Sequence, residues 1–158
     1  MGTRSDIIVH RADGKWTRIY CHWDGYPSHH GPLLLRHYNT QELAEKLVEP
    51  GDMSSLDAKC SKSRDHTFGT PKKGYCVYYG RDRGVEASLG DTLDEVWNTN
   101  DTGTEFSYLW NDGKWWITSP EAGSEAAIPL DIDVIEGRKK VQANIKAFGA
   151  NIVIGKHT

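Results

Sequence analysis

The chain has 158 residues, a length typical of a single domain. Hydrophobic residues make up 37% of it and charged residues 26%, which excludes a wholly disordered chain and a collagen-like fibre. The 19 Lys and Arg against 22 Asp and Glu give a net charge of −3, which excludes a basic field over the whole molecule but allows local basic clusters. We expect an α+β domain over residues 1–120 and a C-terminal helix–strand extension over residues 121–158, which packs on the same core or mediates self-association.

The cellular compartment of the protein and the redox state of its cysteines are predicted from sequence features that the chain lacks. No apolar run approaches the roughly 20 residues that cross a membrane, and no apolar stretch of signal-peptide length follows the N-terminus. Cys21, Cys60 and Cys76 form neither an even set nor a C-x-x-C pair. We therefore expect a reducing, cytoplasmic setting, no membrane contact and no cofactor.

The first predicted element is a β-hairpin. Residues 7–11 and 16–23 are β-prone, and Asp13 and Gly14 between them favour a two-residue type I′ turn that sets Val9 opposite Arg18. In this register the predicted core face carries Ile8, His10, Thr17, Ile19, Cys21 and Trp23. The other face would present Trp16, Tyr20 and His22 to solvent or to a ligand.

The middle of the chain predicts helices followed by a long loop. Pro32 suits the first position of a helix, and Thr40 suits the N-cap of a helix over residues 41–49. Residues 51–73 are predicted as a loop, and loops of that length in compact domains are usually functional or mobile. Residues 74–81 are predicted as a buried central strand, and residues 82–84 as a turn.

The remaining elements complete the predicted fold. Residues 91–97 favour one or two helical turns, and residues 104–118 favour a second hairpin that turns at Asp112 and Gly113 and pairs Trp110 with Trp115. Residues 131–148 favour a helix, with Gly137 as an alternative start, and residues 151–154 a last strand. The fold class is thus α+β: a mainly antiparallel sheet of two hairpins and a central strand, with helices on one face.

The richest segment for chemistry is residues 20–31, YCHWDGYPSHHG, at a predicted junction of strand and helix. Four of the seven His residues fall within residues 22–37. One interpretation is a metal site using His22, Asp24, His29 and His30, with His37 as a further ligand. A second is hydrolysis by His22 and Asp24 as an acid–base pair, although no nucleophile motif accompanies them.

A third interpretation is a site for a small anionic, nucleotide-type ligand. Aromatic rings would stack on a base, guanidinium groups would pair with phosphates, and the helix start would offer free N–H groups. The candidate ligand-binding residues are Trp16, Arg18, Tyr20, His22, Trp23, Asp24, Tyr26, His29, His30, Arg81 and Arg83. Lys59, Lys62, Arg64, Lys72 and Lys73 make residues 59–73 locally basic, which suits either a solvated loop or a lid over an anion.

Five motifs follow one another along the chain: YCHWDGYP at 20–27, Leu34 to Tyr38, GDMSSL at 51–56, RDRG at 81–84 and DGKW at 112–115. Together and in this order they resemble a widespread family of short phage and prophage proteins that has no assigned activity. The resemblance implies an accessory protein of the infected bacterial cytoplasm, and proteins of that kind often counter host defences. We expect it to bind and sequester a small anionic nucleotide-type ligand. The alternatives are a hydrolase, metal-assisted or not, that degrades such a signal, and a protein-binding inhibitor of a host defence enzyme.

Overall fold

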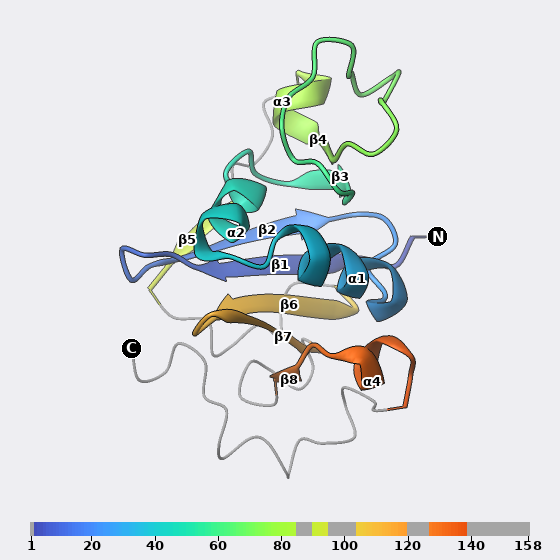
Figure 1. Ribbon diagram of the computed structural model, residues 1–158. Helices are drawn as coiled ribbons and strands as arrows, with labels where there is room; N and C mark the ends of the chain where they lie inside the picture. The colour runs from blue at the N-terminus through green and yellow to red at the C-terminus, as the bar shows by residue number, and fades with distance from the viewer. Residues whose placement is uncertain (1, 85–89, 95–103, 120–126, 139–158) are drawn as a thin grey trace.

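The computed structural model describes residues 2–84, 90–94, 104–119 and 127–138. They form an α+β fold with an eight-stranded, mostly antiparallel sheet, as the sequence predicts (Figure 1). The strands are β1 Ser5–His10, β2 Trp16–Cys21, β3 Met53–Ser55, β4 Val77–Tyr78, β5 Asp91–Leu93, β6 Phe106–Asn111, β7 Lys114–Thr118 and β8 Ile128–Pro129. The helices are α1 Pro27–His37, α2 Gln41–Val48, α3 Tyr79–Arg83 and α4 Ile132–Ile135.

The sheet is organised around β1. Its strand order is β4-β3-β2-β1-β6-β7-β8, and β5 pairs with β2. β1 is antiparallel to β2 and parallel to β6, and its residues Ile7, Ile8 and Val9 are fully buried. A β-branched run without polar alternation is typical of a strand covered on both faces. The centre of the sheet is therefore β1, and the prediction of residues 74–81 as the central strand is wrong.

The first hairpin forms, but its predicted register is wrong by one residue. The Arg11 N–H donates to the Lys15 carbonyl at 2.7 Å, and the Gly14 N–H donates to the Arg11 carbonyl at 3.0 Å. With Gly14 at a φ of 89°, this is a three-residue loop rather than the two-residue turn that its Asp–Gly pair favours. Val9 consequently lies opposite Thr17.

That shift changes which β1 side chains share a face with β2, because strand side chains alternate between faces. Ile7 and Val9, rather than Ile8 and His10, face the large core with Ile19 and Cys21. That core lies between the sheet and the helices, and includes Leu34 of α1, Leu47 of α2 and Val134 of α4. On the opposite face Ile8, Trp16, Leu109 and Ala127 form a smaller buried cluster.

The two main helices differ in how well the sequence predicts them. Thr40 caps α2 as predicted, its side chain accepting a hydrogen bond from the Leu43 N–H at 3.2 Å. α1 begins at Pro27 rather than at Pro32, which lies inside the helix. Both prolines suit a first helical position, and the structure selects the earlier one, where the Tyr26 carbonyl accepts from the His29 and His30 N–H groups.

Residues 51–97 depart most from the predicted pattern. β3 lies within the predicted loop, and β4 is a two-residue strand at the end of the main strand order. The chain then turns into α3 because the Asp82 carboxylate accepts from the Tyr78 N–H at 2.8 Å, and Gly84 ends that helix in the left-handed region. Residues 91–93 form a strand instead of a helical turn, while residues 95–97 lie outside the described residues.

The second hairpin forms as predicted, and the described residues that follow it pack beside it. Trp110 pairs with Trp115 and Tyr108 with Ile117, in the predicted register. β8 pairs with β7, and Leu130 joins the large core, so residues 127–138 pack on the same core as the preceding residues. Gly137 follows the end of α4, and the rest of the predicted helix and last strand, residues 139–154, lies outside the described residues. In the described part of the chain, no helix is both long and apolar enough to span a bilayer.

Gly25, in the turn before α1, packs directly on the start of β1. Its N–H donates to the Thr3 carbonyl at 2.8 Å, and its carbonyl accepts from the Tyr108 hydroxyl at 2.5 Å. A Cβ built at Gly25 would lie 2.7 Å from the Ser5 Cβ and 2.9 Å from the Thr3 carbonyl oxygen. This turn therefore has no room for a larger residue.

We predict that Gly25→Ala lowers the free energy of unfolding by about 1–3 kcal/mol, because the added methyl group overpacks the turn against backbone. Gly69→Ala is the matched control, since a Cβ there meets nothing within 4 Å. Urea unfolding followed by tryptophan fluorescence measures both variants. Equal stability of the two variants would contradict this account of the turn.

Candidate anion-binding surface

Residues 20–31 join β2 to α1, as the sequence predicts. The His22 N–H donates to the Met53 carbonyl at 3.2 Å and the Trp23 N–H to the Ser54 carbonyl at 3.0 Å, which fastens the segment to β3. Asp24 then adopts a φ of 58°, a left-handed conformation that Asp tolerates better than most residues. The result is a tight turn from the sheet into the helix.

The side chains at this turn form two small clusters. The Tyr20 hydroxyl lies 2.6 Å from His22 Nδ1, within hydrogen-bond distance, and burial raises the pKa of Tyr20. His22 also packs against the edge of Trp23 at 4.6 Å between ring centroids. Asp24 interacts instead with Tyr26, whose pKa it raises through its charge and a hydrogen bond. His22 and Asp24 thus belong to different pairs.

The next two histidines lie progressively deeper: His29 is half-buried and His30 is buried. His30 is fully buried, with Nδ1 at 2.9 Å from His29 Nδ1 and Nε2 at 3.1 Å from the Ser5 hydroxyl. Burial, followed by the nearby His29, lowers the pKa of His30 to about 3. Ser5 is also fully buried.

The metal site considered from the sequence does not form among the described residues. No three His, Cys, Asp or Glu side chains there are arranged to hold a metal ion, so His22, Asp24, His29 and His30 are not gathered into one set of ligands.

The other predicted ligand-binding residues are dispersed. Trp16 is fully buried against His10, at a ring distance of 4.2 Å, and does not face solvent as the predicted register implied. Arg18 forms an ion pair with Asp91 at 2.9 Å. Arg81 and Arg83 lie on α3, which follows β4 at the end of the strand order (Figure 1). The described contacts of their guanidinium groups are with Cys60, Cys76, Tyr78, Asp82 and Phe68 rather than with the histidine-rich turn.

Arg81 and Arg83 belong instead to residues 57–84, which we call the basic lobe. These residues project beyond the β3–β4 end of the sheet (Figure 1). They include seven Lys and Arg but only three Asp, a formal charge of +4 in a chain whose total is −3. Six of the seven cations are exposed, whereas Asp65 is the one exposed carboxylate of this fully described segment. Charge is thus strongly segregated within the molecule.

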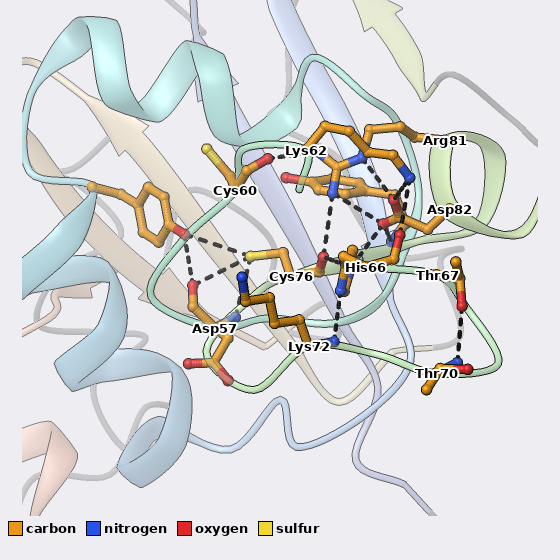
Figure 2. Close-up of polar contacts among 12 residues, drawn as sticks. Asp57, Cys60, Lys62, His66, Thr67, Thr70, Lys72, Cys76, Arg81 and Asp82 are labelled. Carbon is orange, nitrogen blue, oxygen red and sulfur yellow. Dashed lines mark hydrogen bonds and ion pairs between the residues drawn. The ribbon is translucent and has the colours of Figure 1, made fainter. Parts of the chain in front are cut away.

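A buried carboxylate organises the basic lobe from within (Figure 2). The Asp82 side chain has no exposed surface, and it accepts from Arg81 Nε at 2.9 Å, from Lys62 Nζ at 3.2 Å and from the Tyr78 N–H at 2.8 Å. Burial by itself would raise the pKa of Asp82, but these hydrogen bonds outweigh that effect and hold it below the usual value. The carboxylate therefore stays ionised and draws three parts of the lobe together.

The buried His66 forms a second set of hydrogen bonds inside the lobe (Figure 2). It is fully buried, its Nδ1 accepts from the Lys72 N–H at 2.9 Å, and its Nε2 lies 2.9 Å from the Cys76 carbonyl oxygen. A nitrogen that accepts carries no proton, so the other one does, and His66 is the neutral Nε2–H form that donates to Cys76. Its Nε2 also lies 3.3 Å from Asp82 Oδ2. Residues 59–73 are thus tied to β4 and α3.

The thiols of the lobe are held in their protonated form. Cys76 Sγ accepts from the Asp57 N–H at 3.2 Å and lies 3.2 Å from the Asp57 carbonyl oxygen, which also accepts from the Tyr38 hydroxyl at 2.6 Å. Burial raises the pKa of Cys76 to about 11 and also raises that of Cys60. Because the thiolate is the reactive form, these thiols are poor nucleophiles at neutral pH.

Aromatic rings sit among the exposed cations of the lobe. The Lys59 and Lys72 ammonium groups lie 5.3 Å and 5.5 Å from the centroid of Tyr75. Sequence reasoning noted these lysines but not their shared ring, which lies sixteen residues from Lys59 and three from Lys72. The two lysines just before Tyr75 were the sequence signal for a contact between a cation and this ring. Only the fold brings Lys59 beside Tyr75.

Comparison with known proteins adds nothing to this description: no family model, curated protein or solved structure matches the chain. The resemblance to short phage proteins, drawn from five motifs of the sequence, stays a prediction. The assignment of function consequently depends on the residues and geometry of the chain itself.

We predict that Asp82→Asn lowers the free energy of unfolding at pH 7 by about 2–4 kcal/mol, because it leaves Arg81 and Lys62 without their buried anion. Since the pKa of Asp82 is lowered on folding, its contribution is present above the unfolded pKa of about 4 and is lost as pH falls through the folded value. The difference between variant and wild type should therefore shrink below pH 4. Asp65→Asn, an exposed acid of the same lobe, should change stability by less than about 0.5 kcal/mol. Urea unfolding measures both, and equal effects would contradict the role of Asp82.

The buried His30 predicts a second pH effect, of known sign. Its folded pKa of about 3 lies below its ordinary 6.5, so the unfolded chain takes up its proton first as pH falls. Between pH 7 and pH 5 this should cost the wild type roughly 2 kcal/mol of stability that His30→Asn does not lose. Urea unfolding at the two pH values tests this, and parallel losses in both proteins would show that His30 is not the cause.

Proposed function

We propose that this protein binds a small anionic, nucleotide-type ligand without turnover, and that the basic lobe is its binding surface. The observation that carries the proposal is six exposed cations beside one exposed carboxylate, in a chain that is otherwise acidic. Exposed like charges repel one another, and an incoming anion relieves that repulsion. A polyphosphate or a phosphodiester is the common biological ligand of such a field.

The internal ion pairs leave most of this charge available. Asp82 engages Arg81 and Lys62, but Lys59, Arg64, Lys72, Lys73 and Arg83 lie outside its network. Lysine binds phosphate as a point charge, and arginine adds paired donors. Tyr75 offers a ring on which a base can stack. These groups support a ligand that combines phosphate with a planar base.

Two features favour binding over turnover. The thiols of Cys60 and Cys76 are disfavoured as thiolates by burial, and the Ser5 hydroxyl next to His30 has no exposed surface. The proposed role is sequestration, which needs affinity and no chemistry. With the resemblance to phage accessory proteins, sequestration of a host nucleotide signal is the setting we propose.

A second candidate is binding of a host protein, and the exposed aromatics of the α1 turn favour it. Trp23 and Tyr26 are 44% and 40% exposed and lie three residues apart. Trp and Tyr are the residues most often found at the energetic centre of protein interfaces. Capture of a host protein that is lost in Trp23→Ala, with silent nucleotide titrations, would favour this function over the first.

We predict that Lys72→Gln combined with Arg83→Gln weakens nucleotide binding by about 10- to 100-fold, because each of the two hydrogen bonds to phosphate contributes about 1 kcal/mol. The probes are a nucleoside triphosphate and a cyclic dinucleotide, titrated by calorimetry. Lys114→Gln is the control for loss of a cation outside the lobe, on β7, where its ammonium lies 4.4 Å from the Trp116 ring, and it should change affinity less than about twofold. No heat with either probe, from folded protein, would refute the proposal.

A further inference from the structure

We infer that the basic lobe takes its nucleotide-type ligand as a short single strand of nucleic acid. This inference rests on the proposed function, and it adds the form in which the phosphates and bases are presented. It comes from the pairing of rings with cations at two separate places in the lobe. It also comes from the distribution of charge over the whole chain.

The lobe contains two units in which an aromatic ring is paired with cations. In the first, Tyr75 lies under Lys59 and Lys72. In the second, Phe68 lies 5.0 Å from the Arg83 guanidinium and 5.7 Å from the Tyr79 ring. A ring beside a cation matches one nucleotide, whose base stacks while its phosphate pairs, so two units match successive nucleotides.

The cations can leave the rings at little cost. Lys59, Lys72 and Arg83 are exposed, and exposed cation–π contacts are weak. A lysine can therefore move from the ring to a phosphate while the base takes its place on the ring. Tyr75, Phe68 and Tyr79 are themselves half-buried, so they would not need to be ordered by the ligand.

The frame that carries both units is tied together before any ligand binds. His66, fully buried, packs its ring 5.6 Å from that of Tyr75. The Phe68 N–H donates to the Asp82 carbonyl at 3.2 Å, and the Thr70 N–H donates to the Thr67 hydroxyl at 3.0 Å. An ordered frame loses less entropy when its ligand binds.

The charge distribution favours a chain of phosphates confined to this lobe. Five exposed cations lie outside the Asp82 network, which is more than a single phosphate group needs. The rest of the chain sums to −7, the difference between −3 for the whole and +4 for the lobe, and each of the other described segments (2–56, 90–94, 104–119 and 127–138) has a net negative formal charge. A short segment of strand, rather than one that wraps the molecule, fits this pattern.

A single strand fits better than a duplex or a membrane. Duplex readers place a helix or a two-stranded ribbon in the major groove, and the one helix within residues 57–84 is the five-residue α3. Within the described residues, the large exposed apolar side chains are Trp23, Tyr26, Leu43 and Ile132, all outside the lobe, which gives a bilayer no anchor there.

The test measures fluorescence anisotropy of a labelled 12-nucleotide single strand with the full chain. We expect it to bind more tightly than a nucleoside triphosphate or a 12-base-pair duplex, with log K falling against log salt at a slope of about −2 to −3.5 for three to five phosphate contacts. Tyr75→Leu and Phe68→Leu should each weaken binding by about 5- to 100-fold, as loss of one stacked base does. Tyr26→Leu, an exposed aromatic outside the lobe, and Lys114→Gln should leave it within about twofold.

The possible outcomes separate this inference from the proposed function. Nucleotide binding that requires Lys72 and Arg83, without binding of the strand, would overturn the single-strand inference and leave the proposed function standing. Binding of neither would overturn both. Equal binding of strand, duplex and polyglutamate, unchanged in Tyr75→Leu and Phe68→Leu, would show attraction between charges alone and also overturn the inference. Near-ultraviolet circular dichroism checks that each variant is folded.

Discussion

The buried Asp82 carboxylate is the constraint on which the basic lobe depends. An ion out of water is stable only when its charge and lone pairs are satisfied, and Asp82 meets that condition with Arg81, Lys62 and the Tyr78 N–H. Those partners come from the loop, from β4 and from α3, so satisfying one carboxylate positions all three. Long segments with little regular structure rarely hold a shape by apolar packing alone, and here ionic and imidazole contacts supply the order.

This arrangement also explains why the surface of the lobe is so basic. The Asp82 carboxylate at its centre is paired with Arg81 and Lys62 inside the lobe, whereas the remaining cations face solvent. The other described segments each have a net negative formal charge, so among the described residues the excess of cations lies in the lobe. An anion drawn to the molecule would thus be directed to one end of the sheet. The proposed function depends on this separation of charge rather than on any single side chain.

The histidine-rich turn has a structural role that its composition does not reveal. Gly25 docks it on β1, and His30 with Ser5 forms a buried polar contact under α1. These contacts of Gly25 and His30 hold the start of α1 against the sheet. Trp23 and Tyr26 are the large apolar side chains of the turn that are exposed to a partner. A distinctive sequence motif can thus reflect close packing between a turn and a sheet as well as a binding site.

The sequence by itself determined the α+β class, the second hairpin with its Trp110–Trp115 pair, and the Thr40 cap, because each depends on neighbours close in the chain. It did not determine the register of the first hairpin, because a two-residue and a three-residue loop through Gly14 differ little in local energy. The observed register is the one that buries Trp16 in the smaller cluster. Nor did the sequence determine the site: it noted Arg81, Arg83 and the lysines of residues 59–73, but grouped the arginines with the histidine-rich turn. Only the tertiary structure decided that these cations share one lobe, because the burial of His66 and Asp82 joins residues that are distant in sequence, and no local pattern encodes that.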